Sequence, residues 1–311
     1  MIRDADPREG LLDCPSMGFK ARVRALPKLG IGVSTEYGAH TLGETLDPIE
    51  LREQHPAFGR FLEVGVEIAK GLDSDARRWI RDGHPWTYHF LDINLDEPED
   101  FDTEWLSKVS ALVDAHEPAW LCGDAGLWHF GPREPENMLL LPPILSEAAV
   151  RPMADGIEQL RAATAREVFP ENPPGTIFLG DLHILDYFAR VCEAADTGML
   201  LDCAHLAIYQ RLQGMTPTTA LDGFPLDRVV ELHVAGACVK SHAGREIIED
   251  NHGTEVLPDT WKIFDFVLER APNLKAIVFE CERNSLDTTI AGFERIRDAA
   301  QRHGQFEEAP Q

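Results

Sequence analysis

The chain has 311 residues, of which 44% are hydrophobic, and its 53 acidic side chains outnumber its 29 basic ones. This apolar content is enough for a full hydrophobic core and excludes an intrinsically disordered chain. The formal net charge of −24 argues against a nucleic-acid binder, because such proteins neutralise phosphates with clustered lysines and arginines. The charge also disfavours an anionic membrane surface. It is compatible with bound metal cations, although a solvated acidic surface is the simpler explanation.

The cysteines and the amino terminus indicate in which cellular compartment the protein is expected to lie. The six cysteines are spread widely and form no C-x-x-C pair, unlike those of a small secreted disulfide framework. The first residues, MIRDADPREG, are charged, and no apolar run approaches the roughly 18 residues of a membrane span. We therefore expect a cytoplasmic protein with neither a membrane anchor nor a nucleic-acid partner.

Short apolar runs recur along the chain and predict buried strands. They are residues 29–33, 61–66, 87–93, 119–122, 166–169, 199–203, 228–234 and 275–280. Amphipathic segments between them, such as residues 103–116, 145–165 and 260–272, have the spacing of helices. The alternation predicts an α/β fold, a single-domain (β/α)₈ TIM barrel over residues 25–303, with an N-terminal extension (1–24) and a C-terminal tail (304–311). A doubly wound open sheet is the structural alternative.

A side chain able to bind metal ends or follows nearly every predicted strand. In chain order these are Glu36, Glu63, His89, Asp124, Glu171 with Asn172, Asp202 with His205, His233 and Glu280. In a barrel the carboxyl ends of all strands face one rim, so these side chains would converge. Buried carboxylates and imidazoles need compensating cations, and this mixture of nitrogen and oxygen ligands suits Fe, Mn, Zn or Co. The sequence therefore predicts a metal centre at this rim.

Two local spacings add to this prediction. Asp202 and His205 are three residues apart just beyond a strand, so both can reach one metal cluster as the chain enters a helix. Asp250 and His252 are two residues apart, so in an extended segment their side chains lie on the same face.

Other candidates near the rim have weaker signals. His129 and His242 follow the fourth and seventh predicted strands, and substrate contact, metal ligand and solvated side chain all stay open for them. Cys203 and Cys281 are expected to point away from the rim, because side chains alternate along a strand. A nucleophilic or nucleotide-dependent mechanism is unsupported, since the chain has no G-x-S-x-G elbow, no P-loop and no convincing G-x-G-x-x-G motif.

With these residues in this order, the chain resembles the multinuclear non-haem iron-dependent oxidative enzymes, TIM barrels that modify ribosomally synthesised peptides. The resemblance spans about residues 29 to 300 of the printed sequence. It is carried by GIGVSTE (30–36), FLEV (61–64), the single His89, CGDAGLW (122–128), ENP (171–173), LLDCAH (200–205), ELHVAG (231–236), the D-x-H of 250–252 and FE (279–280).

The resemblance implies an oxidase or oxygenase with two or three irons and O₂ as co-substrate. The implied ligands are His89, Asp124, Asn172, Asp202, His205, His233, Asp250, His252 and Glu280, with Glu171 as a ligand or just behind them. Among them, His89, Asp124, Asp202 and His205 are expected to act in catalysis. The implied substrate is a precursor peptide, oxidatively rearranged or cleaved at a residue such as Cys or a C-terminal residue. Many relatives use a leader-peptide-binding partner protein. The peptide is expected to meet residues 125–150 and 236–256.

Three positions depart from the family pattern. EVGVEI places Gly65 where a pattern like EVHxEN has a histidine, Ala125 replaces the histidine after the acid of strand four, and Ala237 follows H-x-A-G. The first departure removes a ligand of a third iron site. Two alternatives stay open: a divalent-metal barrel of the sugar isomerase or endonuclease type, and a non-catalytic scaffold subunit.

Overall fold

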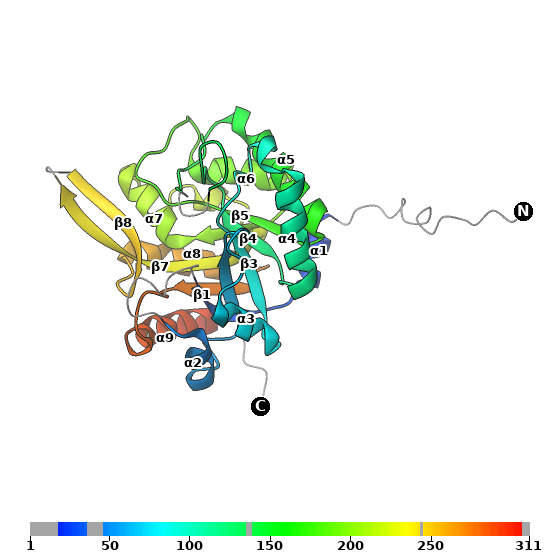
Figure 1. The fold of residues 1–311 in the computed structure, drawn as a ribbon. Helices are drawn as coiled ribbons and strands as arrows, with labels where there is room; N and C mark the ends of the chain where they lie inside the picture. The colour runs from blue at the N-terminus through cyan, green and yellow to red at the C-terminus, as the bar shows by residue number, and fades with distance from the viewer. Residues whose placement is uncertain (1–17, 36–45, 135–138, 243–244, 307–311) are drawn as a thin grey trace, which may run out of the picture.

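The computed structural model describes residues 18–35, 46–134, 139–242 and 245–306 (Figure 1). Eight parallel strands form a closed barrel, because β6 pairs with β7 as well as with β5. The barrel strands are β1 (Gly30–Thr35), β2 (Leu62–Val66), β3 (Trp86–Phe90), β4 (Leu121–Asp124), β5 (Val168–Glu171), β6 (Met199–Asp202), β7 (Val229–His242) and β9 (Ala276–Glu280). The predicted TIM barrel is confirmed, and the open-sheet alternative is wrong.

Helices pack around the barrel (Figure 1), except that α1 (Phe19–Ala25) packs against its interior cluster through Phe19 and Val23. The other helices are α2 (Pro48–Gln54), α3 (Ser74–Arg81), α4 (Thr103–His116), α5 (Glu147–Thr164), α6 (Ile184–Ala194), α7 (Cys203–Leu212), α8 (Pro258–Arg270) and α9 (Leu286–Arg302). Aspartates start several of them: Asp47, Asp73 and Asp102 each accept backbone hydrogen bonds at the first turns of α2, α3 and α4. None of the helices in the described ranges combines the length and hydropathy of a membrane span.

The barrel interior is packed below the rim, which leaves the polar site only one place to form. Inward-facing side chains such as Phe61, Trp120, Phe169 and Leu200 make a fully buried cluster there. Phe19 of α1 packs into the same cluster, so part of the segment predicted to be an extension contacts the barrel. Apart from Glu63 and Glu231, the charged groups of the barrel interior therefore collect at the carboxyl ends of the strands.

One strand was not predicted: β8 (Arg245–Gly253), which pairs antiparallel with the outer half of β7. The two strands form a hairpin that extends from the barrel, in yellow in Figure 1. Gly236 of β7 lies so close to Gly253 that an added Cβ would be 2.1 Å from the Gly253 carbonyl oxygen. The hairpin returns the chain to the rim with Asp250 and His252 near its end. Much of the predicted loop at 236–256 is therefore a strand pair.

Cys203 and Cys281 are both buried in the apolar layer that the barrel shares with its helices, as expected. We therefore predict that Cys203→Ser leaves the metal content unchanged, although the buried hydroxyl lowers stability by about 1–3 kcal/mol. Elemental analysis of the variant beside the wild type measures the first effect, and a thermal melt measures the second. A loss of metal would show that this thiol faces the rim.

Candidate metal centre

The predicted ligands converge above the barrel. The ends of the strands contribute His89 (β3), Asp124 (β4), Glu171 (β5), Asp202 (β6), His233 (β7) and Glu280 (β9), all buried. The first turn of α7 adds His205, and β8 adds Asp250 and His252. A cavity of about 350 Å³ opens onto this set and is lined by His89, Asp124, His205, Asp250, His252 and Glu280 among others. We call these nine side chains the rim cluster.

One side of the rim cluster brings together His89, Asp124 and Glu171, whose ligand atoms lie within 4.8 Å of one another. His89 Nε2 is 2.9 Å from Glu171 Oε2. Glu171 also belongs to a second such group, with Asp202 and His233. Because a carboxylate can bridge two ions, Glu171 is placed to connect neighbouring metal positions.

The other side of the rim cluster brings together Asp202, His205 and Glu280, again within 4.8 Å. Asp202 is the N-cap of α7, and one of its oxygens accepts the backbone N–H of His205. The helix start therefore determines where both side chains lie. Asp250 Oδ2 lies 2.8 Å from His205 Nε2 and 3.4 Å from His252 Nε2, so the hairpin completes this side.

Two histidines are each held by a hydrogen bond at one ring nitrogen, whereas His233 has ion-pair contacts with carboxylates on both sides. Nδ1 of His205 is 2.9 Å from the carbonyl oxygen of Asn172, and Nδ1 of His252 is 2.5 Å from Glu282. Nε2 of His233 lies 3.1 Å from Glu63, which leaves its Nδ1 facing Glu171 at 3.5 Å and Glu280 at 3.3 Å. Metal-binding histidines are usually oriented in this way by a partner on the other nitrogen.

Sequence reasoning placed Glu63 at a strand end but not among the ligands, and it missed Glu231 and Glu282. Glu63 and Glu231 point into the barrel beneath His233, where Trp120 Nε1 donates to Glu231 at 2.7 Å. The inward direction of Glu231 follows from its two-residue spacing from His233, and that of Glu63 from its two-residue spacing from Phe61, so both signals were available in the sequence. Glu282 lies beyond β9, where the strand period no longer applies.

Asn172 is placed differently from the other implied ligands. Its side-chain amide donates to the carbonyl oxygen of Asp202 and accepts the Asp202 N–H, each at 3.0 Å. In the structure this side chain positions the start of α7, and its role as a metal ligand stays a prediction. Glu36 lies outside the described residues.

Burial and the charges of neighbouring side chains shift the pKa values of the rim cluster. Burial, reinforced by Glu280 and Glu171, raises the pKa of Asp202 to about 7, although His205 opposes the shift. Burial alone would lower the pKa of His89, but Glu63 and Glu171 outweigh it and raise that pKa to about 9. Without cations, this cluster therefore retains protons that bound metal would displace.

Several buried oxygen and nitrogen atoms of the rim cluster, each of a kind that can bind a metal ion, have no hydrogen-bond partner among the described residues. They are Asp124 Oδ1, Glu171 Oε1, Asp202 Oδ2, Asp250 Oδ1, Glu280 Oε2 and both ring nitrogens of His233. Leaving such atoms unsatisfied is costly, and their mixture of oxygen and nitrogen suits borderline divalent and trivalent cations. The residues present therefore fit a centre of more than one metal ion.

The three positions that depart from the family pattern all lie near this centre. Gly65 lines the cavity beside His89, its neighbour across the β2–β3 pair. Ala125 is fully buried after β4, and Ala237 packs with Ile208 and Ile248.

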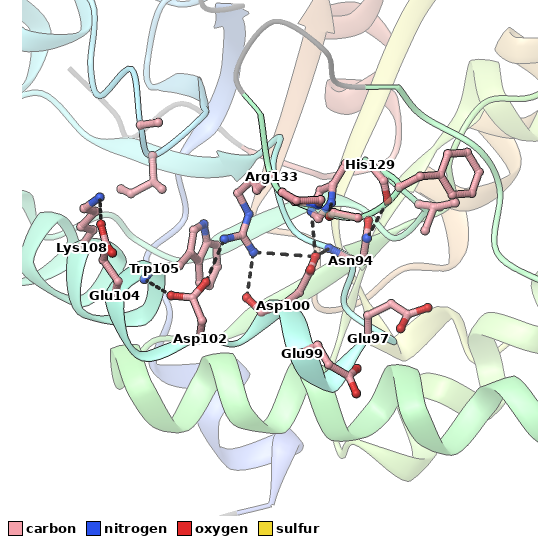
Figure 2. A pocket seen from close by; sticks show the side chains of 16 residues that line it. Asn94, Glu97, Glu99, Asp100, Asp102, Glu104, Trp105, Lys108, His129 and Arg133 are labelled. Carbon is pink, nitrogen blue, oxygen red and sulfur yellow. Dashed lines mark hydrogen bonds and ion pairs between the residues drawn. The ribbon is translucent and has the colours of Figure 1, made fainter.

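His129 is buried but belongs to a separate pocket of about 680 Å³ (Figure 2). Its Nε2 is 2.9 Å from Asp100, and its Nδ1 is 2.7 Å from the Gly131 carbonyl oxygen. Arg133 forms ion pairs with Asp100 and Asp102 in the same pocket. His129 thus joins the β3–α4 and β4–α5 loops. The side chain of His242 is outside the described residues.

Comparisons with known proteins identify the family of this chain. The family model of the RiPP precursor modification enzyme MbnB/TglH/ChrH matches residues 30–301 (RiPPs are ribosomally synthesised, post-translationally modified peptides). A UPF0276 protein of Acaryochloris marina is 24% identical over 281 residues, covering 89% of this chain and 94% of that protein. One of Rhizobium meliloti is 26% identical over 216 residues, covering 68% and 69%.

Solved structures share the fold at low identity. A xylose isomerase-like TIM barrel protein of Mycobacterium smegmatis in complex with magnesium has a TM-score of 0.55 and 12% identity, over 90% of this chain and 98% of that one. A protein of Thermus thermophilus soaked with ZnCl₂ has a TM-score of 0.51 and 17% identity, over 86% and 98%. These likenesses show the barrel, whereas the family model spans nearly all of it together with the rim. The chain therefore belongs to the MbnB/TglH/ChrH family of RiPP precursor modification enzymes.

Proposed function

We propose that this protein uses iron and O₂ to modify a residue of a ribosomally synthesised precursor peptide oxidatively. The reaction is a rearrangement or bond cleavage at a residue such as Cys or a C-terminal residue. The single observation that carries the proposal is the overlap of the ligand groups: Glu171, Asp202 and His233 each belong to two of them. Such sharing suits adjacent ions in a family that modifies precursor peptides.

Two irons are proposed, one held by His89, Asp124 and Glu171 and the other by residues on the opposite side of the rim cluster. That second side offers Asp202, His205, Asp250, His252 and Glu280. Bound iron would supply O₂ activation and the redox change. A third iron is not proposed, because Gly65 offers no side chain where the family pattern has a histidine.

The protein's own contribution is to position the peptide and to exclude water. Trp128 is 8% exposed and lines the cavity. Its ring N–H donates to the Asp124 carbonyl oxygen at 3.1 Å, and its backbone N–H donates to Asn94 at 2.6 Å. A ring held this firmly forms a fixed wall beside the rim cluster, which favours one orientation of the bound residue. The reaction would take place in the cytoplasm, where ribosomes release precursor peptides, with a leader-binding protein as a proposed helper.

The first test is elemental analysis with Mössbauer spectroscopy of protein purified anaerobically from iron-supplemented cells. We expect about two irons per chain with magnetically coupled ferric or mixed-valence signals, because the donor groups overlap. Oxygen uptake should then require both iron and peptide. One zinc or manganese per chain, or no metal, would contradict the proposal.

The alternative is metal-dependent isomerase or hydrolase chemistry on the same rim cluster. The magnesium-bound Mycobacterium smegmatis neighbour shares the barrel, and that fold can serve many reactions. Activity with Mn or Mg in the absence of O₂ would favour this alternative. A protein that binds no metal at all would instead favour the scaffold subunit.

A further inference from the structure

A second cavity of about 350 Å³ adjoins the metal centre and is mostly apolar. Leu141 and Pro142 of the β4–α5 loop and Ile177 of the β5–α6 loop line it. Ile208 of α7 and Ile248 of β8 also line it and are buried at 1% and 3% exposure. We call this cavity the apolar groove.

The apolar groove is continuous with the metal cavity. Leu140, Pro174 and Asp250 line both spaces. Asp250 is also the rim-cluster carboxylate that lies 2.8 Å from His205 Nε2. A molecule seated in the groove therefore ends beside the rim cluster, and a substrate that fills the metal cavity extends naturally into the groove.

Two of the apolar side chains that line the groove are strongly exposed, Leu141 at 46% and Ile177 at 71%. Ile144 and Leu179, in the same two loops, are 57% and 62% exposed. They belong to two loops that are tied together, because the Leu145 N–H donates to the Leu179 carbonyl oxygen at 2.7 Å. Exposed apolar residues that gather beside a functional cavity mark a binding surface, whereas scattered ones need no explanation.

We propose that the apolar groove binds an apolar segment of the precursor peptide next to the residue that is modified. The identity of this occupant rests on the proposed function. A cavity of about 350 Å³ has room for a few side chains of an extended peptide. It is too small to be the main contact of a stable protein interface, which buries about 800 Å² of each partner. In the described part of the sheet β8 is an edge strand, so its outer backbone groups are also placed to pair with an extended peptide.

The test is a selection of phage-displayed random dodecapeptides on the metal-loaded protein. We expect enriched peptides to carry apolar side chains in a short run. The best of them, labelled with fluorescein, should bind Ile177→Ser or Leu141→Ser about tenfold more weakly, because each variant removes one buried apolar contact. Both side chains are largely exposed, so neither change should unfold the barrel.

Phe130→Ser is the matched control, because Phe130 is also 71% exposed but lines the separate pocket of Figure 2. Its affinity for the labelled peptide should equal that of the wild type. Enrichment of basic peptides that depend on Glu97 or Glu99 of that pocket would overturn the proposal. So would failure to enrich any sequence, or equal binding by all three variants.

The selection also separates this proposal from the proposed function, because it measures binding and requires no oxidation. Groove-dependent binding by a protein that lacks iron or O₂ chemistry would leave the groove standing and refute the oxidase. Iron-dependent oxidation whose rate is unchanged in Ile177→Ser and Leu141→Ser would support the oxidase and refute the groove.

Discussion

Protein with His233→Ala is expected to lose its bound metal and its activity while the barrel stays folded. His233 lies at the centre of the rim cluster, with Nδ1 within 3.5 Å of Glu171 and 3.3 Å of Glu280. Its removal takes a nitrogen ligand from both groups that share it, so metal content should fall below about a tenth of the wild-type value. Elemental analysis measures the metal, and circular dichroism measures the fold.

Asp202→Asn is a second variant, which tests the role of this side chain as a metal ligand separately from its role as the N-cap of α7. One Asp202 oxygen caps α7, and the other is a buried atom without a hydrogen-bond partner among the described residues. Asparagine caps a helix about as well as aspartate, but its NH₂ group cannot bind a cation. Metal should again be lost, with the helix retained. Wild-type metal content in either variant would refute the assignment of the rim cluster.

The strand ends of the rim were predictable because the barrel imposes simple rules on them. A buried run fixes the strand, and the carboxyl end of every strand faces the same rim. Asp124, Glu171 and Asp202 are the last residues of β4, β5 and β6, so residues distant in sequence were correctly expected to meet. A weak apolar run at 166–169 was enough to place β5 within two residues. The regular alternation of strands and helices on either side of it already required a strand in this region.

The outer half of β7 and all of β8 could not be found in the same way. Apart from the packing of Ala237 and Ile248 on Ile208 and the contacts of Asp250 and His252 at the rim, these strands mainly contact each other, and their exposed positions mix apolar with polar residues such as Lys240, Glu246 and Glu249. Hydrophobic periodicity has no signal there. The expectation that Asp250 and His252 lie together is met, since Asp250 Oδ2 is 3.4 Å from His252 Nε2, but the segment is not regularly extended: the strand register shifts there and His252 has a φ of 48°.

The supporting residues of the site were harder to predict than the rim itself. Glu282 holds His252 through Nδ1 at 2.5 Å and also accepts from Ser34 Oγ at 3.1 Å. Both contacts depend on tertiary placement of a residue beyond β9, which no local pattern encodes. The double hydrogen bond of Asn172 with the Asp202 backbone is of the same kind. Sequence spacing identifies groups that can bind metal, and it does not determine which atom of each is already used.

Metal-free protein is expected to lose stability as the pH rises from 6 to 9. Burial, with repulsion from neighbouring carboxylates, raises the pKa of Asp202 from 3.8 to about 7 and that of Glu231 from 4.5 to about 8. The pKa of His89 is raised from 6.5 to about 9, because Glu63 and Glu171 outweigh its burial. All three groups therefore bind more protons in the folded than in the unfolded chain within this window.

Stability contributed by a raised pKa is complete below the unfolded value and is lost as the pH passes the folded value. Glu171 and Asp250 have lowered pKa values, because nearby histidines outweigh their burial, and they act only below about pH 4. For the rim cluster and Glu231, the shifted pKa values that fall in this window therefore all lower the free energy of unfolding as the pH rises. The melting temperature of chelator-treated protein should fall by about 3–5 °C across this window, which corresponds to a loss of about 2–3 kcal/mol.

The metal-loaded protein should show the opposite trend or none, because cations displace those protons and bind more tightly as the pH rises. Melting curves of both forms at pH 6, 7, 8 and 9 make the comparison. Metal-free Asp202→Asn is the control, and its slope should be shallower than that of the metal-free wild type because one titrating carboxyl is gone. A metal-free protein that melts at the same temperature throughout, or at a higher one in alkali, would show that the rim cluster is not the repulsive set of charges that its geometry indicates.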